Sequence, residues 1–284
     1  MKKSFIEKVL FVVVLYKQQL EDSLTLKSLN EKLRIWNICA DVVVYDNSPE
    51  ESGLLPNFSW ENFNIIYHHD ANNPGVSTAY NYGATLALDL QKEWLLLLDQ
   101  DTTFEADYLA KNILAIAKYP DVSLFAPVLK LKNGMVFSPS IPKHKRGYPP
   151  KNLTYGKLSL WQFSPVNSGV LIKTELFHAA GGYNEKVKLD FSDFQFMERV
   201  RKIDDHFVLV ESVALQDFSS FEPSIKKQET RFIQYLDDAY YSDKPRLSDK
   251  IGFFYAVSRH ALGLTIKLKS FSFLSLYIRK FIIR

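Results

Sequence analysis

The sequence predicts an α/β fold built on a mostly parallel sheet. Short apolar runs rich in β-branched residues alternate with segments whose leucines recur at near-helical spacing. One of these runs, Trp94–Leu98, is continuously apolar, which is typical of a strand buried on both faces of a parallel sheet. After Phe221 the pattern is helical only. We therefore expect a Rossmann-like domain over residues 1–220 and a helical C-terminal region over residues 221–284.

The first half of the chain supplies the β-α-β alternation. Strands are expected at Val9–Leu15, Asp41–Tyr45, Asn64–His68 and Trp94–Leu98; helices are expected from Leu20 to Leu33, from Ser77 to about Leu90, and from about Glu105 to Lys118.

The second half is less regular. A strand at Val122–Leu131 should turn at Asn133-Gly134 and return at Met135–Phe137, while Ser138–Leu158 is expected to be a long loop. Further strands are expected at Leu160–Val166, Gly169–Lys173, His206–Val210 and Val213–Phe218; helices should begin at Thr174 and Asp193 and cover Ile225–Tyr241, Leu247–Ile266 and Phe271–Ile283.

Composition narrows the functional classes. The chain has 284 residues and a net charge of +3, which is too mild to predict a nucleic-acid partner. Its single cysteine, Cys39, excludes an internal disulfide and fits a reducing compartment. We find no signal peptide and no apolar stretch of about 18 to 20 residues, so we expect a cytoplasmic protein. The end of the chain, 271–284, is apolar and basic, and suits either a membrane-surface helix or a helix packed on the domain.

Acidic residues follow two of the expected strands. Asp99 and Asp101 come directly after the apolar run, and Asp46 follows the second strand. Because open parallel sheets bind ligands at the carboxyl ends of their strands, these side chains are candidate ligand contacts. Carboxylate oxygens suit Mg2+ or Mn2+, although Asp also favours turns, so an acidic turn is an equal alternative for Asp99 and Asp101.

Several motifs together resemble one family. Asp46, N-P-G-V-S-T-A-Y-N-Y-G at 73–83, D-Q-D at 99–101, and N-S-G at 167–169 followed by G-G-Y-N-E and D-F-S-D are similar to family 2 inverting glycosyltransferases of the GT-A fold. The similarity is to the rhamnosyltransferase-like branch that builds bacterial surface polysaccharide, and it covers roughly Val9 to Phe218. Each motif alone is weakly specific, whereas their order and spacing are specific for the fold.

The resemblance implies roles for individual residues. Leu15 and Asp46 would line the nucleobase pocket, Asp99 would approach the ribose or sugar and the metal, and Asp101 would bind a Mg2+ or Mn2+ ion that bridges the diphosphate. The remaining implied roles are nucleotide-sugar binding for Asn73, Gly75 and Asn81, the acceptor side for Ser168 and Gly169, and the general base for Asp190 or Asp193.

The chain departs from the family in three places. Family members often have an adjacent Glu-Asp pair, whereas here Phe191-Ser192 separates Asp190 from Asp193. This spacing matches the D-x-x-D of the rhamnosyltransferase-like branch and favours Asp190 as the base, with Asp193 second. A histidine is usual after the late strand, but Gln216 and Asp217 stand there. An Arg-Asn pair is usual in the following helix, where this chain has Asp237-Asp238.

The sequence therefore predicts a metal-dependent glycosyltransferase. Its donor would be a dTDP- or UDP-sugar, rhamnose being the sugar that the branch suggests, and its acceptor a lipid-linked saccharide at the inner membrane face. One alternative is a non-catalytic or partner-dependent protein of the same fold. Another is a nucleotidyltransferase, which normally has a Gly-rich basic loop after the first strand; Tyr16–Leu20 contains no glycine.

Overall fold

The structure, a computed structural model, describes residues 2–51, 60–217 and 224–283. The predicted domain boundary between residues 220 and 221, the predicted strand end at Phe218 and the basic Arg284 lie outside the described residues.

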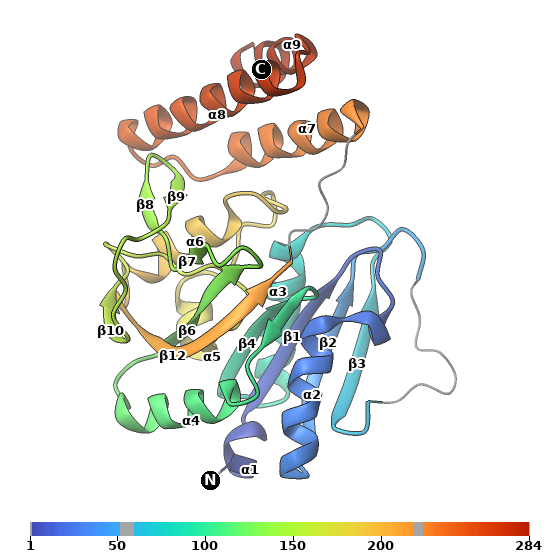
Figure 1. The fold of residues 1–284 in the computed structure, drawn as a ribbon, viewed down its shortest axis with the longest axis vertical. Coiled ribbons are helices and arrows are strands. Elements are labelled where there is room, and N and C mark those ends of the chain that lie inside the picture. Colours follow the sequence, from blue (N-terminus) through green and yellow to red (C-terminus); the bar gives the residue numbers. More distant parts are fainter. Residues whose placement is uncertain (1, 52–59, 218–223, 284) are drawn as a thin grey trace.

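The parallel part of the sheet comes from the N-terminal half of the chain. Its strands are β1 (Val9–Leu15), β2 (Ala40–Asp46), β3 (Phe63–His69) and β4 (Trp94–Asp99), in the order β4-β1-β2-β3. Their carboxyl ends point toward the C-terminal helices (Figure 1). The acids that follow β2 and β4 are thereby brought to the same edge of the sheet.

The sheet continues beyond β4 with mixed directions. Next to β4 lie, in order, β11 (Val170–Lys173), β6 (Leu124–Leu131), β12 (His206–Gln216) and β10 (Gly156–Ser159), with β5 (Thr102–Phe104) paired to β12 and β7 (Val136–Ser138) to β6. Strand β11 is antiparallel to both neighbours, whereas β12 is parallel to β6. The end of β12 therefore lies at the same edge as the ends of β1 and β4.

Helices cover both faces of the sheet. α2 (Leu24–Trp36) and α4 (Tyr108–Lys118) pack on one face, and α3 (Val76–Asp89), α5 (Thr174–Ala179) and α6 (Ser192–Val200) pack on the other. Successive residues of β1 alternate between these two layers, as the two-residue period of a strand requires. Burial on both faces explains why the strand is apolar throughout. Before β1 and α2 lie the short helices α1 (Lys2–Ile6) and η1 (Leu20–Asp22).

The C-terminal helices have a hydrophobic core of their own. They are α7 (Ile225–Tyr241), α8 (Leu247–Leu268) and α9 (Ser272–Tyr277), followed by a π-helical turn, Ile278–Ile282. Phe232, Phe253 and Phe273 are buried together among them. Among the described residues, no helix is both long and apolar enough to cross a membrane.

The predicted α/β fold with a C-terminal helical extension is confirmed. The hairpin predicted at Asn133-Gly134 is also present: the Gly134 amide donates to the Leu131 carbonyl and β7 returns along β6.

Three predictions about the second half are wrong. The region 138–158, expected to be a loop, contains a hairpin of β8 (Ile141–Lys143) and β9 (Arg146–Tyr148) and most of β10. The hairpin turn uses His144 and Lys145 with positive φ instead of the usual Asn or Gly, so the residues give no turn signal. Ion pairs from Lys145 to Glu198 and Asp249, both 2.8 Å, hold the turn in place.

The other two errors concern strands. Region 160–166 makes a turn and an isolated bridge from Ser164 to Ser140 rather than a strand. The two strands expected at 206–210 and 213–218 are the single strand β12, whose register against β6 shifts between Leu209 and Val213. Such an irregularity interrupts the two-residue pattern without ending the strand.

Candidate active site

A cavity of about 420 Å3 opens at the edge where β1, β4 and β12 end. Three acidic side chains line it: Asp99 at the end of β4, Asp101 in the turn that follows, and Asp193 in the first turn of α6. The other lining residues are Val14, Tyr16, Val76, Gln100, Phe137, Val166, Asn167, Leu189 and Gln216. None of these described lining residues is basic, so the lining provides no positively charged side chain to offset the three acids.

The surroundings of the three acids favour their neutral forms. Burial raises the pKa of Asp99, and burial together with the charge of Asp99 raises the pKa of Asp101 to about 7. Burial, with smaller effects of Asp99 and Asp190, also raises the pKa of Asp193 to about 7. A bound cation would offset this concentration of negative charge.

Two neutral side chains hold Asp99 in position. The buried Tyr80 hydroxyl donates to Asp99 Oδ1 at 2.9 Å, and Gln216 Nε2 lies 3.3 Å from Asp99 Oδ2. The same Gln216 nitrogen lies 3.3 Å from Asp101 Oδ1. Gln216, which stands where the glycosyltransferases that the sequence resembles usually have a histidine, therefore bridges the two acids. Asp217 instead forms a salt bridge with Lys132 at 2.5 Å.

The site fits a divalent cation by its donor set. Asp99 and Asp101 offer carboxylate oxygens, and the buried Oε1 of Gln216 has no hydrogen-bond partner among the described residues. Mg2+ and Mn2+ take oxygen ligands of these kinds. Another acidic group, Asp204, Asp205 and His206, lies at the opposite end of β12 and is remote from this cavity.

The structure separates the two base candidates. Asp193 lines the cavity, whereas the Asp190 carboxylate is paired through both oxygens with the guanidinium of Arg231 on α7, with Arg231 Nη2 at 2.8 Å from Asp190 Oδ1. Asp190 is not among the residues lining the cavity. The geometry thus favours Asp193 over Asp190, the reverse of the preference drawn from the sequence spacing.

The predicted nucleobase contacts are in the interior. Asp46 is fully buried, and its carboxylate accepts hydrogen bonds from the Tyr67 hydroxyl at 2.6 Å and from the Ser48 amide at 2.9 Å. Leu15 is also fully buried, and its carbonyl accepts from the Asn47 amide. Neither lines the cavity, so their contact with a nucleobase stays a prediction.

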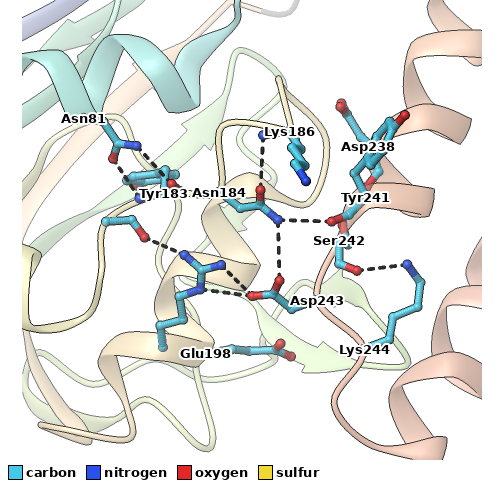
Figure 2. Close-up of polar contacts among 12 residues, drawn as sticks. Asn81, Tyr183, Asn184, Lys186, Glu198, Asp238, Tyr241, Ser242, Asp243 and Lys244 are labelled. Carbon is cyan, nitrogen blue, oxygen red and sulfur yellow. Dashed lines mark hydrogen bonds and ion pairs between the residues drawn. The ribbon is translucent and has the colours of Figure 1, made fainter.

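The residues of the predicted nucleotide-sugar loop tie α3 to the segment before α6. Gly75, with φ of 98°, begins α3 against the Lys188 backbone; a Cβ there would lie 2.3 Å from the Lys188 carbonyl oxygen. The Lys188 ammonium donates to the Asn73 carbonyl at 3.2 Å. Asn81 bonds Tyr183 in both directions, at 3.0 and 2.8 Å (Figure 2). None of these three residues lines the cavity, so their contact with a nucleotide sugar stays a prediction.

The predicted acceptor-side residues, Ser168 and Gly169, pack against the turn that carries Asp99 and Asp101. The buried Ser168 hydroxyl lies 2.6 Å from the Thr102 hydroxyl and accepts from the Asp99 amide at 3.3 Å. Gly169, with φ of 83°, has no room for a side chain, because a Cβ would lie 2.7 Å from the Phe104 ring. Asn167, the preceding residue, is the one of this motif that lines the cavity.

The C-terminal helices hold the segment that enters the cavity. The buried Asp238 carboxylate on α7 accepts from the amides of Lys188, Leu189 and Asp190 at 2.8 to 3.1 Å. Nearby, the Asn184 amide group points toward the Tyr241 carbonyl and Asp243, as Figure 2 shows. Leu189 lines the cavity, so α7 fixes part of its wall.

Sequence reasoning missed three residues that organise this site. Tyr80 was part of a motif without a role, Gln100 had no role, and Asp238 was noted only as a departure from the family pattern. Gln100 bonds the Tyr16 backbone in both directions, with Oε1 2.7 Å from the amide and Nε2 3.2 Å from the carbonyl oxygen. The available signal for Asp238 was an acid between the apolar residues Leu236 and Ala239 of an amphipathic helix.

Comparison with solved structures identifies the fold. S. aureus TarS 1-349 is 15% identical over 90% of this chain and 92% of that chain, with a TM-score of 0.50. TarS 1-349 in complex with UDP-GlcNAc is 15% identical over 96% and 79%, with a TM-score of 0.58, and a longer S. aureus TarS structure is 16% identical over 88% and 42%, with a TM-score of 0.50. At this identity the likeness establishes the fold alone. No protein-family model and no curated protein sequence matches the chain.

Proposed function

We propose that the protein is a metal-dependent inverting glycosyltransferase that uses a nucleotide-diphosphate sugar. The observation that carries the proposal is the convergence of Asp99, Asp101 and Asp193 on one cavity at the carboxyl edge of a GT-A-type sheet. The chain has the same fold as TarS, whose structure was solved in complex with UDP-GlcNAc, and this likeness supports a nucleotide-sugar donor. The donor would be a UDP- or dTDP-sugar, with rhamnose as the first sugar to test, and the acceptor a lipid-linked saccharide of bacterial surface polysaccharide at the inner membrane face.

The proposed reaction is a single displacement. The acceptor oxygen forms a bond to the anomeric carbon while the bond from that carbon to the diphosphate breaks, and the acceptor proton passes to Asp193. A divalent cation would stabilise the charge that develops on the leaving diphosphate. Asp101 and Asp99 would hold that cation, and Tyr80 and Gln216 keep Asp99 oriented toward the cavity.

Asp193 suits the role of base for two reasons. Its pKa of about 7 lies near neutral pH, where a base combines adequate strength with the correct ionisation. It also lines the same cavity as the metal-ligand candidates, whereas Asp190 is ion-paired with Arg231.

Two measurements test the proposal. In a thermal-shift screen, UDP or dTDP with Mn2+ should raise the melting temperature by roughly 5 °C at saturating ligand, while purine diphosphates should not. In a transfer or donor-hydrolysis assay, Asp193→Asn should lower kcat by about 10^2 to 10^4 with nucleotide binding retained, and Asp190→Asn should have a much smaller effect. Equal losses in the two variants would contradict the assignment of Asp193.

A non-catalytic role is the second candidate, because Gln216 rather than histidine stands beside the two acids. A nucleotide-dependent thermal shift without hydrolysis or transfer, for every donor and metal, would favour it.

A further inference from the structure

Helix α8 has two apolar faces, of which only one is packed. Phe253, Val257 and Ala261 are buried against α7 and α9. The helices of a small domain normally present one apolar stripe to the core and a polar surface to water. The exposed side of α8 does not follow this rule.

A stripe of exposed apolar side chains runs along that exposed side. It consists of Leu247, Ile251, Phe254, Leu262 and Ile266, whose spacings of three, four and eight residues place them on one side of the helix. Leu247 is 72% exposed and Ile266 is 76% exposed, so the stripe is open at both ends. At 1.5 Å per residue it spans roughly 28 Å. We call these five residues the α8 stripe.

Two basic residues flank the α8 stripe. At about 100° per residue, Lys250 and Arg259 fall on opposite flanks of it, and both are exposed. The exposed basic residues in the described segment 247–283 are Lys250, Arg259, Lys267, Lys269, Arg279 and Lys280. The acidic residue of the same segment, Asp249, is paired with Lys145 at 2.8 Å.

The positive charge of these residues indicates which kind of partner the α8 stripe binds. A second copy of the chain docked through the same face would bring these basic residues toward their counterparts, which is unfavourable. A bilayer with anionic headgroups satisfies both the apolar stripe and its basic flanks. We propose that the α8 stripe lies in the interface of an anionic membrane.

The surface differs from the one that the sequence suggested. For the C-terminal segment 271–284 the sequence suits a membrane-surface helix and a helix packed on the domain equally, and in the structure Phe273 and Tyr277 are buried in the helical core. Phe271, three residues beyond the end of α8, is 80% exposed. The proposal rests on this surface and not on the proposed catalytic function.

Co-sedimentation with vesicles tests the proposal on the full chain. The protein should bind vesicles that contain phosphatidylglycerol and should bind much more weakly to phosphatidylcholine alone or at high salt. Replacing Leu262→Ser together with Ile266→Ser should lower partitioning by at least about tenfold. Leu114→Ser is the matched control, because Leu114 is 63% exposed on α4 at the other end of the molecule.

Three further measurements make the test decisive. Circular dichroism and nucleotide binding should be the same in the wild type and in both variants, since all of the replaced side chains are exposed. The proposal is overturned if the wild type does not bind anionic vesicles, or if Leu114→Ser loses as much binding as the α8 variant. It is also overturned if sedimentation equilibrium shows a dimer that the α8 variant dissociates, because the occupant would then be a second copy.

Discussion

The carboxylate of Asp238 lies 2.8 Å from the backbone nitrogen of Asp190, across the junction between the C-terminal helices and the sheet domain. The same carboxylate accepts from the two preceding amides, so three consecutive peptide groups converge on one side chain. Asp193 lies in the first turn of α6, only a few residues later. The position of the proposed base therefore depends on a residue of α7.

Replacing Asp238 should slow turnover more than it weakens donor binding. In Asp238→Ala the segment 188–190 loses its shared acceptor, and a shift of about 1 Å at the base would lower kcat by up to about 10^2-fold. Steady-state kinetics and nucleotide titration would separate the two effects. Asp237→Ala, on the same helix, is the control; equal kcat values for the two variants would show that Asp238 does not position the base.

Replacing Gln216 by histidine should strengthen metal binding. An imidazole beside Asp99 and Asp101 adds a nitrogen ligand that Mn2+ accepts more readily than Mg2+ does. Calorimetric titration of Mn2+ in the presence of UDP should show a lower Kd for Gln216→His and a higher one for Gln216→Leu, which offers no ligand atom. Identical Kd values in all three proteins would place the cation elsewhere.

The metal-free protein should lose stability as pH rises from about 4 to about 7. Asp101 and Asp193 have folded-state pKa values of about 7 against an ordinary value of 3.8, so in this range the folded protein holds protons that the unfolded chain has released. Each such group lowers the free energy of unfolding by up to about 1.4 kcal/mol per pH unit.

Urea unfolding at a series of pH values would measure this slope. The double variant Asp101→Asn, Asp193→Asn should flatten it, and Mn2+ added above pH 7 should restore stability to the wild type. A stability that rises with pH over this range would refute the assignment of these raised pKa values.

Replacing Gln100 should weaken nucleotide binding. In Gln100→Ala the backbone of Tyr16 loses both of its hydrogen bonds to this side chain, and Tyr16 lines the cavity. We expect the Kd for UDP to rise by about tenfold, consistent with one to two lost hydrogen bonds. Isothermal titration measures it, with the exposed Gln19→Ala as the control. A tenfold loss in the control as well would point to a general effect on this loop.

The sheet was largely predictable because its strands are buried on both faces. The run Val9–Leu15 is apolar at every position and matches β1 residue for residue. Turns and edge strands were harder to predict from the sequence. The turn at His144 and Lys145 depends on ion pairs with Glu198 and Asp249, which are distant in sequence. Local residue preferences contain no information about such partners.

The acids of the cavity were predictable for a related reason. A carboxylate that follows a buried strand must lie at the sheet edge, which places Asp99 and Asp101 without knowledge of any other residue. The choice between Asp190 and Asp193 depended on Arg231, which takes one of them out of the cavity. Likewise Gln100 acts through hydrogen bonds to Tyr16, which lies 84 residues away in sequence, and spacing alone could not reveal this contact.

The contact between Asp238 and the segment 188–190 also limits how this protein can be divided or recombined. A catalytic fragment that ends before α7 would retain every proposed metal ligand and the proposed base, yet would leave three backbone amides without their acceptor. Grafting the C-terminal helices of another enzyme onto this sheet domain would consequently alter the turnover rate as well as the attachment surface. The two parts must therefore be inherited, or engineered, as a pair.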